Sequence, residues 1–307
     1  MSLVKKLYQP WFLFRPRQLF QTVARAARER VQGRAATPVE IVLPWGLRMA
    51  VDPAEAIGRC VWLTGIFDLS VTEVLYRLVQ PGDVAVDVGS NIGYMASIMA
   101  IRAGPLGRVL AFEPHPLTFE RLAQNVTRFR ECPRTAPISQ LCAACSGSDG
   151  DAELVCPPGF PSNHGLASLS LDRGQGGPRY RVRTARLDTL LGEVPKVRVV
   201  KIDVEGHEFE VLHGATEMLA TRRIRTVVYE NEEGPQHPAN AFLRDHGYSV
   251  LQIGRTMTRL VLAPVNAPPV CPPHDPPSYL ATCEPAEVLA TLSRRGWQSL
   301  RHRLRVP

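Results

Sequence analysis

Long hydrophobic runs are missing from this chain of 307 residues. No apolar stretch approaches the roughly 20 residues that a membrane-spanning helix needs. The aromatic segment at residues 11–14 lacks the continuous apolar core and the cleavage site of a signal peptide. A transmembrane protein is therefore not expected, and the cytoplasm is the expected location.

A disulfide framework is missing as well. The seven cysteines are Cys60, Cys132, Cys142, Cys145, Cys156, Cys271 and Cys283. Their odd number and their scatter through apolar segments are typical of reduced, buried thiols. Cys142 and Cys145 have C-x-x-C spacing, but no second cysteine pair or histidine pair accompanies them. We expect no metal site.

The chain also lacks a basic stretch arranged for nucleic acid. The formal net charge is +7, but Lys and Arg gather in residues 5–34 and 294–305, and the centre has no basic run with interleaved aromatics. No nucleic-acid partner is expected. Residues 17–31 are predicted to form a basic helix with an apolar side that includes Phe20 and Val23. Its favoured role is packing on the domain or on a partner subunit, and the alternative is contact with an anionic membrane.

Most of the remaining chain alternates short β-branched runs with helical segments. The predicted strands are residues 84–88, 108–112, 138–145, 197–204 and 225–230, and the predicted helices are residues 92–103, 116–129, 208–220 and 239–246. This alternation predicts an α/β fold with a doubly wound, mainly parallel, Rossmann-like sheet. Two further strands, 248–253 and 260–263, are joined by a short turn and should pair antiparallel at the sheet edge.

Four regions follow from composition and pattern. We expect a basic helical extension at 1–36, a hairpin and helix cap at 37–78, the α/β domain at 79–263, and a proline-rich connector with a basic tail at 264–307. The connector leads into a short helix at 285–295. Residues 149–186, rich in Gly, Pro and Ser, are predicted to form an inserted antiparallel excursion at one edge of the sheet, with a mobile loop.

The turn after the first predicted strand indicates a ligand site. It contains Asp87, Gly89, Ser90, Asn91 and Gly93, in the pattern D-x-G-x-N-x-G. A dinucleotide fingerprint requires a glycine where Asn91 stands, so that a pyrophosphate can approach the backbone. A side chain there, with an acid before the turn, suits a cationic ligand without phosphate, such as S-adenosylmethionine (SAM).

Polar residues also follow the other predicted strands. Glu113 stands 24 positions after Gly89 (113 minus 89), where an acid can accept hydrogen bonds from ribose hydroxyls. At the end of the fourth strand, alternation places Lys201, Asp203 and Glu205 on one side, followed by His207. The structural alternative is that Lys201 pairs with a carboxylate, and that Glu205 or Glu208 caps the next helix.

The fifth strand ends in Glu230 and Asn231. With Asp203 these residues could bind a divalent cation, or they could position a substrate hydroxyl for deprotonation by His207. We favour the version without a metal.

These segments resemble the FkbM family of SAM-dependent methyltransferases. The matching pieces, within residues 65–253, are Pro81-Gly82-Asp83, VDVGSNIGY, AFEPHP, Asn125, LDTL, KIDVEGHEFEVLHGA and Gly247-Tyr248. The resemblance implies a class I methyltransferase fold with a seven-stranded sheet whose last-inserted strand is antiparallel. It implies O-methylation of a hydroxyl on a sugar, glycan or polyketide. Asp68 stands where the family often has glutamate, and Cys145-Ser146 falls in the region that would touch adenine, with no acid before Asp149.

The resulting hypothesis is direct transfer of the SAM methyl group to a hydroxyl-bearing small molecule or glycan. Asp87 and the glycine turn would position the methionine part, and Glu113 the ribose. His207 is the candidate general base, because the pKa of histidine is near neutral. Asp203, Glu205 and Glu230 would orient the substrate or the base. The alternatives are an NAD(P)-dependent oxidoreductase, a SAM-binding protein without catalysis, and a nucleic-acid methyltransferase.

Overall fold

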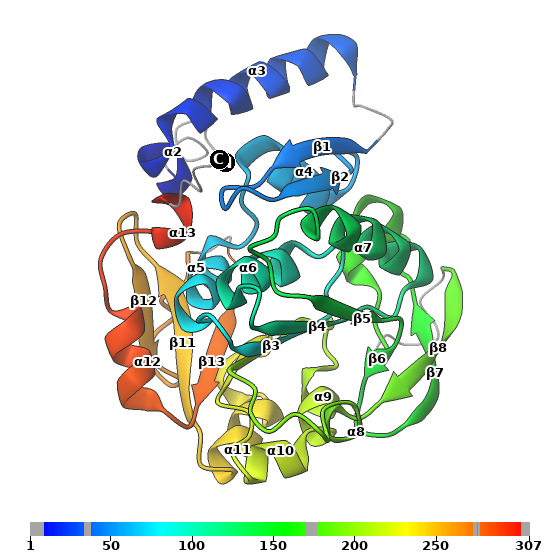
Figure 1. Cartoon of the computed structure of the whole chain (residues 1–307), viewed down its shortest axis with the longest axis vertical. Coiled ribbons are helices and arrows are strands. Elements are labelled where there is room, and N and C mark those ends of the chain that lie inside the picture. Colours follow the sequence, from blue (N-terminus) through cyan, green and yellow to red (C-terminus); the bar gives the residue numbers. More distant parts are fainter. Residues whose placement is uncertain (1–8, 34–37, 170–176, 273–274, 276, 302–307) are drawn as a thin grey trace.

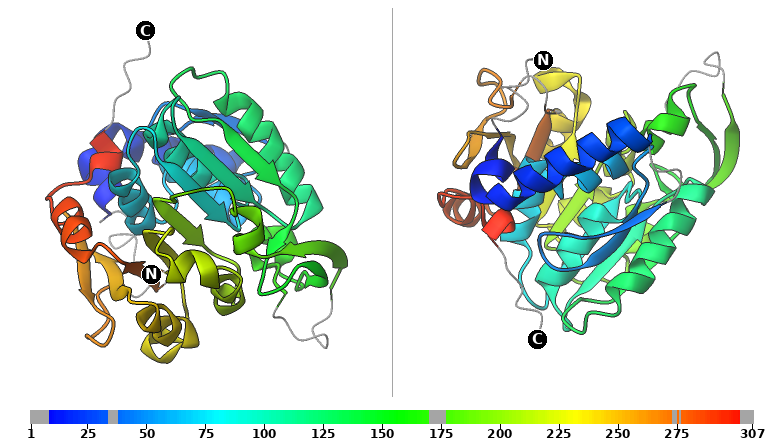
Figure 2. Two further views of the ribbon diagram at one scale, coloured as in Figure 1. Left: turned by 60° about the horizontal axis from the view of Figure 1, so that its bottom comes forward. Right: turned by 90° about the horizontal axis from the view of Figure 1, so that it is seen from above.

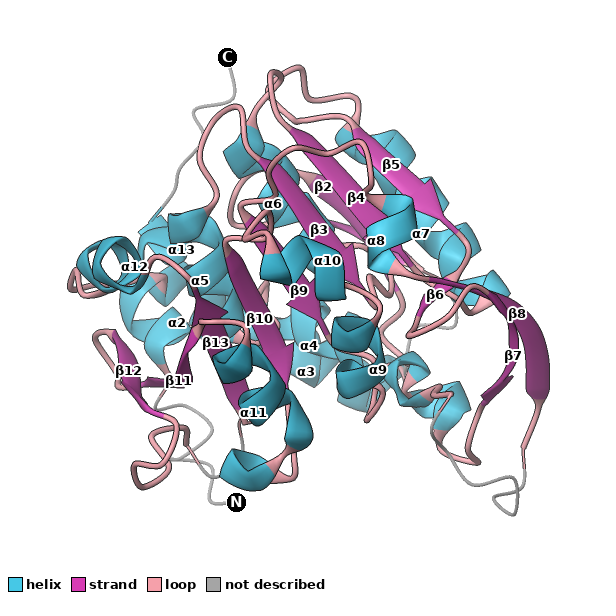
Figure 3. Cartoon of the chain, turned by 90° about the horizontal axis from the view of Figure 1, so that it is seen from below, coloured by secondary structure: helices cyan, strands magenta, loops and turns pink. Residues whose placement is uncertain are grey.

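A mixed sheet of eight strands forms the centre of the protein. In this computed structural model, residues 9–33, 38–169, 177–272, 275 and 277–301 are described. The strands lie in the order β12-β11-β13-β10-β9-β3-β4-β5 (Figure 3). Their bounds are β3 Val84–Val88, β4 Arg108–Phe112, β5 Ile138–Leu141, β9 Val199–Ile202, β10 Thr226–Glu230, β11 Ser249–Arg255, β12 Leu260–Pro264 and β13 Ser278–Thr282.

The strands from β10 to β5 are parallel, as predicted. From β3 the chain builds outward through β4 to β5, then returns to the other side of β3 and adds β9 and β10. The strand order therefore reverses between β3 and β9, which is where open α/β sheets bind their ligands. All four residues of β9 and the last four of β3 are buried, which explains why both strands read as near-continuous apolar runs.

The antiparallel part of the sheet differs from the prediction. β11 and β12 pair antiparallel, as expected. However, β13 lies between β10 and β11 and is antiparallel to both, so the sheet has eight strands rather than seven. This inserted strand comes from the predicted proline-rich connector. All five of its residues are buried, but so short a run next to prolines carries no strong strand signal of its own.

Helices cover both faces of the sheet (Figure 1). One face carries α5 (Leu69–Leu78), α6 (Tyr94–Ala103) and α7 (Pro116–Phe129), and the other carries α9 (Glu208–His213), α10 (Thr216–Ala220) and α11 (Pro238–Asp245). The prediction of a single helix at 208–220 is wrong, because the helix is interrupted between α9 and α10. A Cβ at Gly214 would lie 2.0 Å from the carbonyl oxygen of Ser146, so the break lies where two backbones meet.

The helices after β13 belong to the same core. α12 (Pro285–Leu292) and α13 (Gln298–Arg301) pack on α5. In α5, the buried Glu73 accepts hydrogen bonds from the backbone N–H groups of Gln298 and Ser299 and pairs with Arg77. This buried pair ties the C-terminal segment to the helix.

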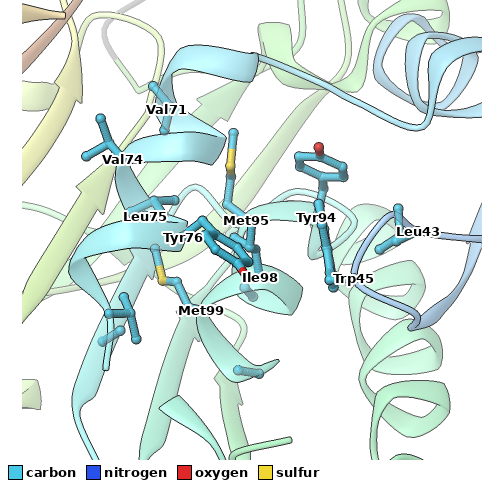
Figure 4. Packing of buried hydrophobic residues seen from close by; sticks show 14 of the residues in the cluster. Leu43, Trp45, Val71, Val74, Leu75, Tyr76, Tyr94, Met95, Ile98 and Met99 are labelled. Atoms are coloured by element: carbon cyan, nitrogen blue, oxygen red, sulfur yellow. The ribbon is translucent and has the colours of Figure 1, made fainter. Parts of the chain in front are cut away.

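The N-terminal hairpin closes the core on the α6 side. Its strands are β1 (Val39–Val42) and β2 (Arg48–Val51), which pair antiparallel as predicted. Trp45, in the turn, packs on Tyr94 at the start of α6, with ring centroids 5.2 Å apart (Figure 4). The Trp45 indole N–H donates to Ser97 Oγ at 3.1 Å. The hairpin is thereby held against the helix that follows the glycine turn.

The predicted third strand is divided between two sheets. β5 ends at Leu141, and β6 (Ala144–Cys145) joins β8 (Arg179–Ala185) and β7 (Gly150–Val155) in a separate three-stranded sheet. β7 and β8 pair antiparallel, as expected for the insertion. Two short 3₁₀ turns, η1 (Phe160–Ser162) and η2 (His164–Leu166), follow β7, and a four-residue helix α8 (Leu187–Leu190) follows β8. The predicted mobile loop falls largely on residues 170–176, outside the described residues.

The helices α2 (Pro10–Phe14) and α3 (Pro16–Gln32) precede the hairpin, and α4 (Ala56–Thr64) directly follows it. α3 corresponds to the predicted basic helix, whereas α2 and α4 were not predicted. α3 packs on α4 and lies along the outside of the molecule (Figures 1 and 2). Within the described residues, no helix combines the length and the apolar character needed to cross a membrane.

Candidate active site

A cavity of about 350 Å³ lies at the carboxyl ends of β3, β4, β9 and β10. Its volume falls in the range of small-molecule pockets. The turn after β3 forms one wall, and the segment after β9 forms another. The insertion and α4 supply further residues, including residues 163–169, Ala56 and Ile57. The cavity therefore lies where the strand order reverses.

The glycine turn has no room for a side chain at its first glycine. Gly89 has φ +72°, and a Cβ there would lie 1.9 Å from the Asp203 carbonyl oxygen. The N–H groups of Gly89 and Ser90 both donate to the Phe112 carbonyl, at 3.0 and 2.9 Å. Ser90 Oγ donates to the Asp87 carbonyl at 2.7 Å. This glycine lets three strand ends approach one another.

Glu113 is held by the turn that it faces. One of its oxygens accepts from the Asn91 N–H and the other from the His115 N–H, both at 2.9 Å. Burial raises the pKa of Glu113 to about 7. Glu113, Ser90 and Asn91 line the cavity. Because a carboxylate can accept up to about four hydrogen bonds, Glu113 keeps capacity for the hydroxyls of a ligand.

Gly93 and Asn125 fix the glycine turn against α7 and the hairpin. Gly93 has φ +90°, and a Cβ there would lie 2.8 Å from Leu122 of α7. The buried Asn125 amide donates to the Ile92 carbonyl at 2.9 Å and accepts from the Ala50 N–H at 2.8 Å. These contacts join the turn, α7 and the hairpin.

Lys201 pairs with carboxylates, as the structural alternative predicted. Its Nζ lies 3.5 Å from Asp87 Oδ1 and 3.2 Å from Asp203 Oδ2, and it donates to the Gly89 carbonyl at 3.1 Å. Burial disfavours the charge on Lys201, but Asp203 and Asp87 outweigh this effect and raise its pKa. Burial also raises the pKa of Asp87, with Lys201 opposing the shift. Asp87 is not among the cavity-lining residues and lies beneath the turn.

His207 lines the cavity just before α9. Its Nε2 lies 3.0 Å from Ser146 Oγ. Burial lowers the pKa of His207, so the imidazole is neutral at pH 7. The loop that carries it is held by Glu208, whose Oε1 accepts from the N–H groups of Val204 and Gly206. Glu208, the first residue of α9, thus holds the loop before the helix, and within the described part of the chain no side-chain hydrogen bond from the N-cap residue His207 caps α9.

An acidic cluster occupies the side of the cavity toward β10. Glu205, at φ +56°, and Glu230 both line it, together with Asp203 and Glu232. Burial and then Asp203 raise the pKa of Glu205 to about 7. Burial, Asp203 and then Asp68 raise the pKa of Glu230 to about 9. The cluster favours a positively charged ligand.

Like Asp87 and Gly93, two further predicted residues lie outside the cavity wall. Asp68 caps α5, where its Oδ1 accepts from the Val71 N–H at 3.1 Å, and its neighbour Phe67 lines the cavity instead. Asn231 bonds within its own loop, to the Gly234 carbonyl and the Glu233 N–H. Within the described residues, no three His, Cys, Asp or Glu side chains are arranged to hold a metal ion.

The insertion contributes residues to the cavity that the sequence did not predict. Asn163, His164 and Ser168 line the cavity, and Ser168 Oγ donates to the Glu205 carbonyl at 2.7 Å. His164 Nδ1 lies 3.2 Å from Arg121 of α7. The only signal was a group of polar residues within a Gly- and Pro-rich segment, which reads as an ordinary loop. Asp149, the only acid considered near the adenine region, instead accepts from the Arg186 N–H and Thr189 Oγ1.

The Methyltransferase FkbM domain family model matches residues 87–250. The matched segment runs from Asp87 in β3 into β11, so it contains the glycine turn, Glu113 and the polar segment after β9. The chain belongs to the FkbM methyltransferase family. The resemblance seen in the sequence is confirmed, and this protein is a methyltransferase.

Named relatives agree with this assignment. The FkbM-family chain is 36% identical over 192 residues to hexuronic acid methyltransferase AglP of Haloferax volcanii, covering 62% of this chain and 72% of AglP. It is 31% identical to 31-O-demethyl-FK506 methyltransferase FkbM of Streptomyces tacrolimicus, over 56% of this chain and 75% of that protein. It is 27% identical to 2-O-methyltransferase NoeI of Sinorhizobium fredii, over 52% of this chain and 69% of NoeI.

Proposed function

We propose that this methyltransferase binds SAM in the cavity and methylates a hydroxyl group of a sugar. The charge of the cavity lining is the observation that carries the proposal. Five acidic residues line the cavity, against one lysine that already pairs with Asp87 and Asp203: Glu113, Asp203, Glu205, Glu230 and Glu232. Such a lining complements a sulfonium cation, and it opposes the pyrophosphate of a dinucleotide.

The walls of the cavity suit the three parts of SAM. The turn from Gly89 to Gly93 would hold the methionine part, and Glu113 would accept hydrogen bonds from the ribose hydroxyls. Apolar side chains on the far wall, including Phe112 and Leu154, would contact the adenine. When bound, SAM supplies the electrophilic methyl group. The protein contributes mainly by aligning this methyl group with the acceptor oxygen.

His207 is the residue we propose as the general base. It lines the cavity, and its lowered pKa keeps a lone pair available at neutral pH. Ser146 Oγ, 3.0 Å from Nε2, would orient the ring. Asp203, Glu205 and Glu230 would position the acceptor, with Asn163 and His164 of the insertion offering further hydrogen-bonding groups.

The relatives and the polar residues of the cavity lining support a sugar as the acceptor. One relative is named for a hexuronic acid and another as a 2-O-methyltransferase. A sugar has several hydroxyl groups that need hydrogen-bonding partners. Asn163 and His164 of the insertion offer such partners, and so do the acidic residues that follow β9 and β10. The product we expect is a methyl ether.

The test has two stages. Calorimetry with SAM, S-adenosylhomocysteine and NAD should show binding of the first two and none of NAD. Labelled methyl from SAM should then enter uronic-acid-containing glycans in a form that survives mild alkali, as an ether does and a carboxyl methyl ester does not. Absence of SAM binding would contradict the whole proposal, whereas alkali-labile label would contradict only the hydroxyl acceptor.

A further inference from the structure

The helix α3 faces the protein with its polar side. The side chains directed at α4 are Gln18, Thr22, Arg25 and Glu29. Gln18 and Thr22 donate to the Leu63 carbonyl at 2.9 and 2.6 Å. Arg25 donates to the Trp62 carbonyl, and Glu29 pairs with Arg59. The helix is therefore attached through hydrogen bonds and an ion pair rather than through an apolar stripe.

The apolar side of α3 faces outward. Phe20, Val23, Ala24, Ala27 and Val31 follow the three-to-four-residue spacing of one helix face, and we call them the outer face of α3. Phe20, Val23 and Val31 are 75%, 56% and 84% exposed. Figure 2 (right), the view from above, shows α3 lying across the outside of the molecule. An ordinary surface helix has the opposite arrangement.

The charges beside the outer face are all positive. Arg17, Arg28 and Arg30 are exposed, and no ion pair holds any of them within the described part of the chain. The one acidic residue of α3, Glu29, points to Arg59 on the protein side. A strip of large apolar side chains flanked by arginines is the pattern of helices that lie in the interface of an anionic bilayer.

We propose that the outer face of α3 binds the surface of an anionic phospholipid bilayer, with the helix axis in the membrane plane. The arginines would contact lipid phosphates while Phe20, Val23 and Val31 enter the headgroup region. A second copy of the chain fits this face less well. In a symmetric pair the arginines of the two helices would be brought close together, and like charges repel.

This attachment would also orient the active site. α3 packs on α4, and α4 supplies Ala56 and Ile57 to the cavity wall. The membrane would therefore be separated from the cavity by α3 and α4. The proposal does not depend on the acceptor, because it rests on the surface of α3 alone.

Vesicle sedimentation with the full chain tests the proposal. Binding to phosphatidylcholine vesicles should be weak, and adding phosphatidylglycerol should strengthen it in a salt-sensitive manner. F20S/V31S should weaken binding at least about tenfold through lost apolar burial. R17Q/R28Q/R30Q should weaken it on the order of 100-fold, since each arginine near an anionic surface contributes about fivefold.

The matched control is Leu106→Ser, an exposed apolar residue (89%) away from α3, which should leave vesicle binding unchanged. All variants should keep the wild-type melting temperature and SAM affinity, because the substituted side chains are exposed. Equal binding to neutral and anionic vesicles, or an equal loss with L106S, would overturn the proposal. A wild-type dimer that F20S/V31S converts to monomers would also overturn it and assign the face to a second copy.

Discussion

Lys201 and Asp87 face each other on the neighbouring parallel strands β9 and β3, with Nζ 3.5 Å from Oδ1 of a carboxylate that has no exposed surface. Because an isolated buried charge is costly, the lysine is what makes this aspartate tolerable. The pair joins the strand that ends in the glycine turn to the strand that ends in the polar cluster.

Replacing Lys201 by methionine should destabilise the protein strongly. The change leaves Asp87 buried without its cation, which typically costs about 3–5 kcal/mol. Urea unfolding measures the loss. Lys196→Met, at an exposed lysine shortly before β9, should change stability by less than about 0.5 kcal/mol. Similar losses in both variants would contradict a special role for the buried pair.

The destabilisation in K201M should depend on pH. Burial raises the pKa of Asp87, and the loss of Lys201 removes the main influence that opposes that shift. A carboxyl group with a higher pKa in the folded state holds its proton more tightly when folded. The free energy of unfolding therefore falls as the pH rises above the unfolded value of about 3.9. K201M should lose more stability at pH 8 than at pH 5, measured by urea unfolding at both values.

Gly89→Ala should damage both stability and cofactor binding. Gly82→Ala is the matched control, because Gly82 also has positive φ (+89°) but no atom within 4 Å of a Cβ. The control should cost about 1–2 kcal/mol for backbone strain alone and leave SAM affinity unchanged. G89A adds the 1.9 Å approach to the Asp203 carbonyl, so it should cost more and weaken SAM binding in calorimetry. Normal SAM affinity in G89A would show that the turn does not form the binding wall.

Binding of SAM should release protons near neutral pH. Burial raises the pKa of Glu230 to about 9 and that of Glu113 to about 7, so Glu230 is mainly protonated at pH 7. A sulfonium cation favours the charged carboxylates and lowers these pKa values. SAM affinity should therefore rise from pH 6 to pH 8. The affinity for S-adenosylhomocysteine should change much less, because its sulfur carries no charge.

Calorimetry in buffers of different ionisation enthalpy counts the released protons. Glu230→Gln should lower the count for SAM. Glu233→Gln, an exposed residue that does not line the cavity, should not lower it. An unchanged count in E230Q would remove Glu230 from the cation-binding group.

His207→Ala should reduce kcat about 10²–10⁴-fold, the usual effect of losing a general base. His213→Ala is the matched control, because His213 is exposed at the end of the same helix, and it should retain full turnover. Because burial lowers the pKa of His207, activity should fall as the pH drops below the usual histidine value of about 6.5 and the imidazole becomes protonated. Full turnover in H207A would eliminate it as the base.

Local patterns predicted the repeating α/β unit well. The bounds expected for β3, β4 and α7 agree with the structure, because a buried parallel strand is a continuous apolar run and Pro116 marks the first turn of its helix. Broken elements were predicted less well. The divisions at Leu141 and Gly214 depend on what the backbone meets across the molecule, and nothing in the neighbouring residues encodes that contact.

The sequence by itself determined the order of strands and helices, the glycine turn, and the polar residues at the strand ends, since each is a local pattern of residue types. Only the tertiary structure decided that Lys201 neutralises a buried aspartate and that β13 enters the sheet between β10 and β11. It likewise decided that residues of the insertion line the cavity. It also decided which side of α3 faces outward. The physical reason is common to all four: partners distant in sequence determine whether a charge is paired, a short strand is buried or an apolar face is covered.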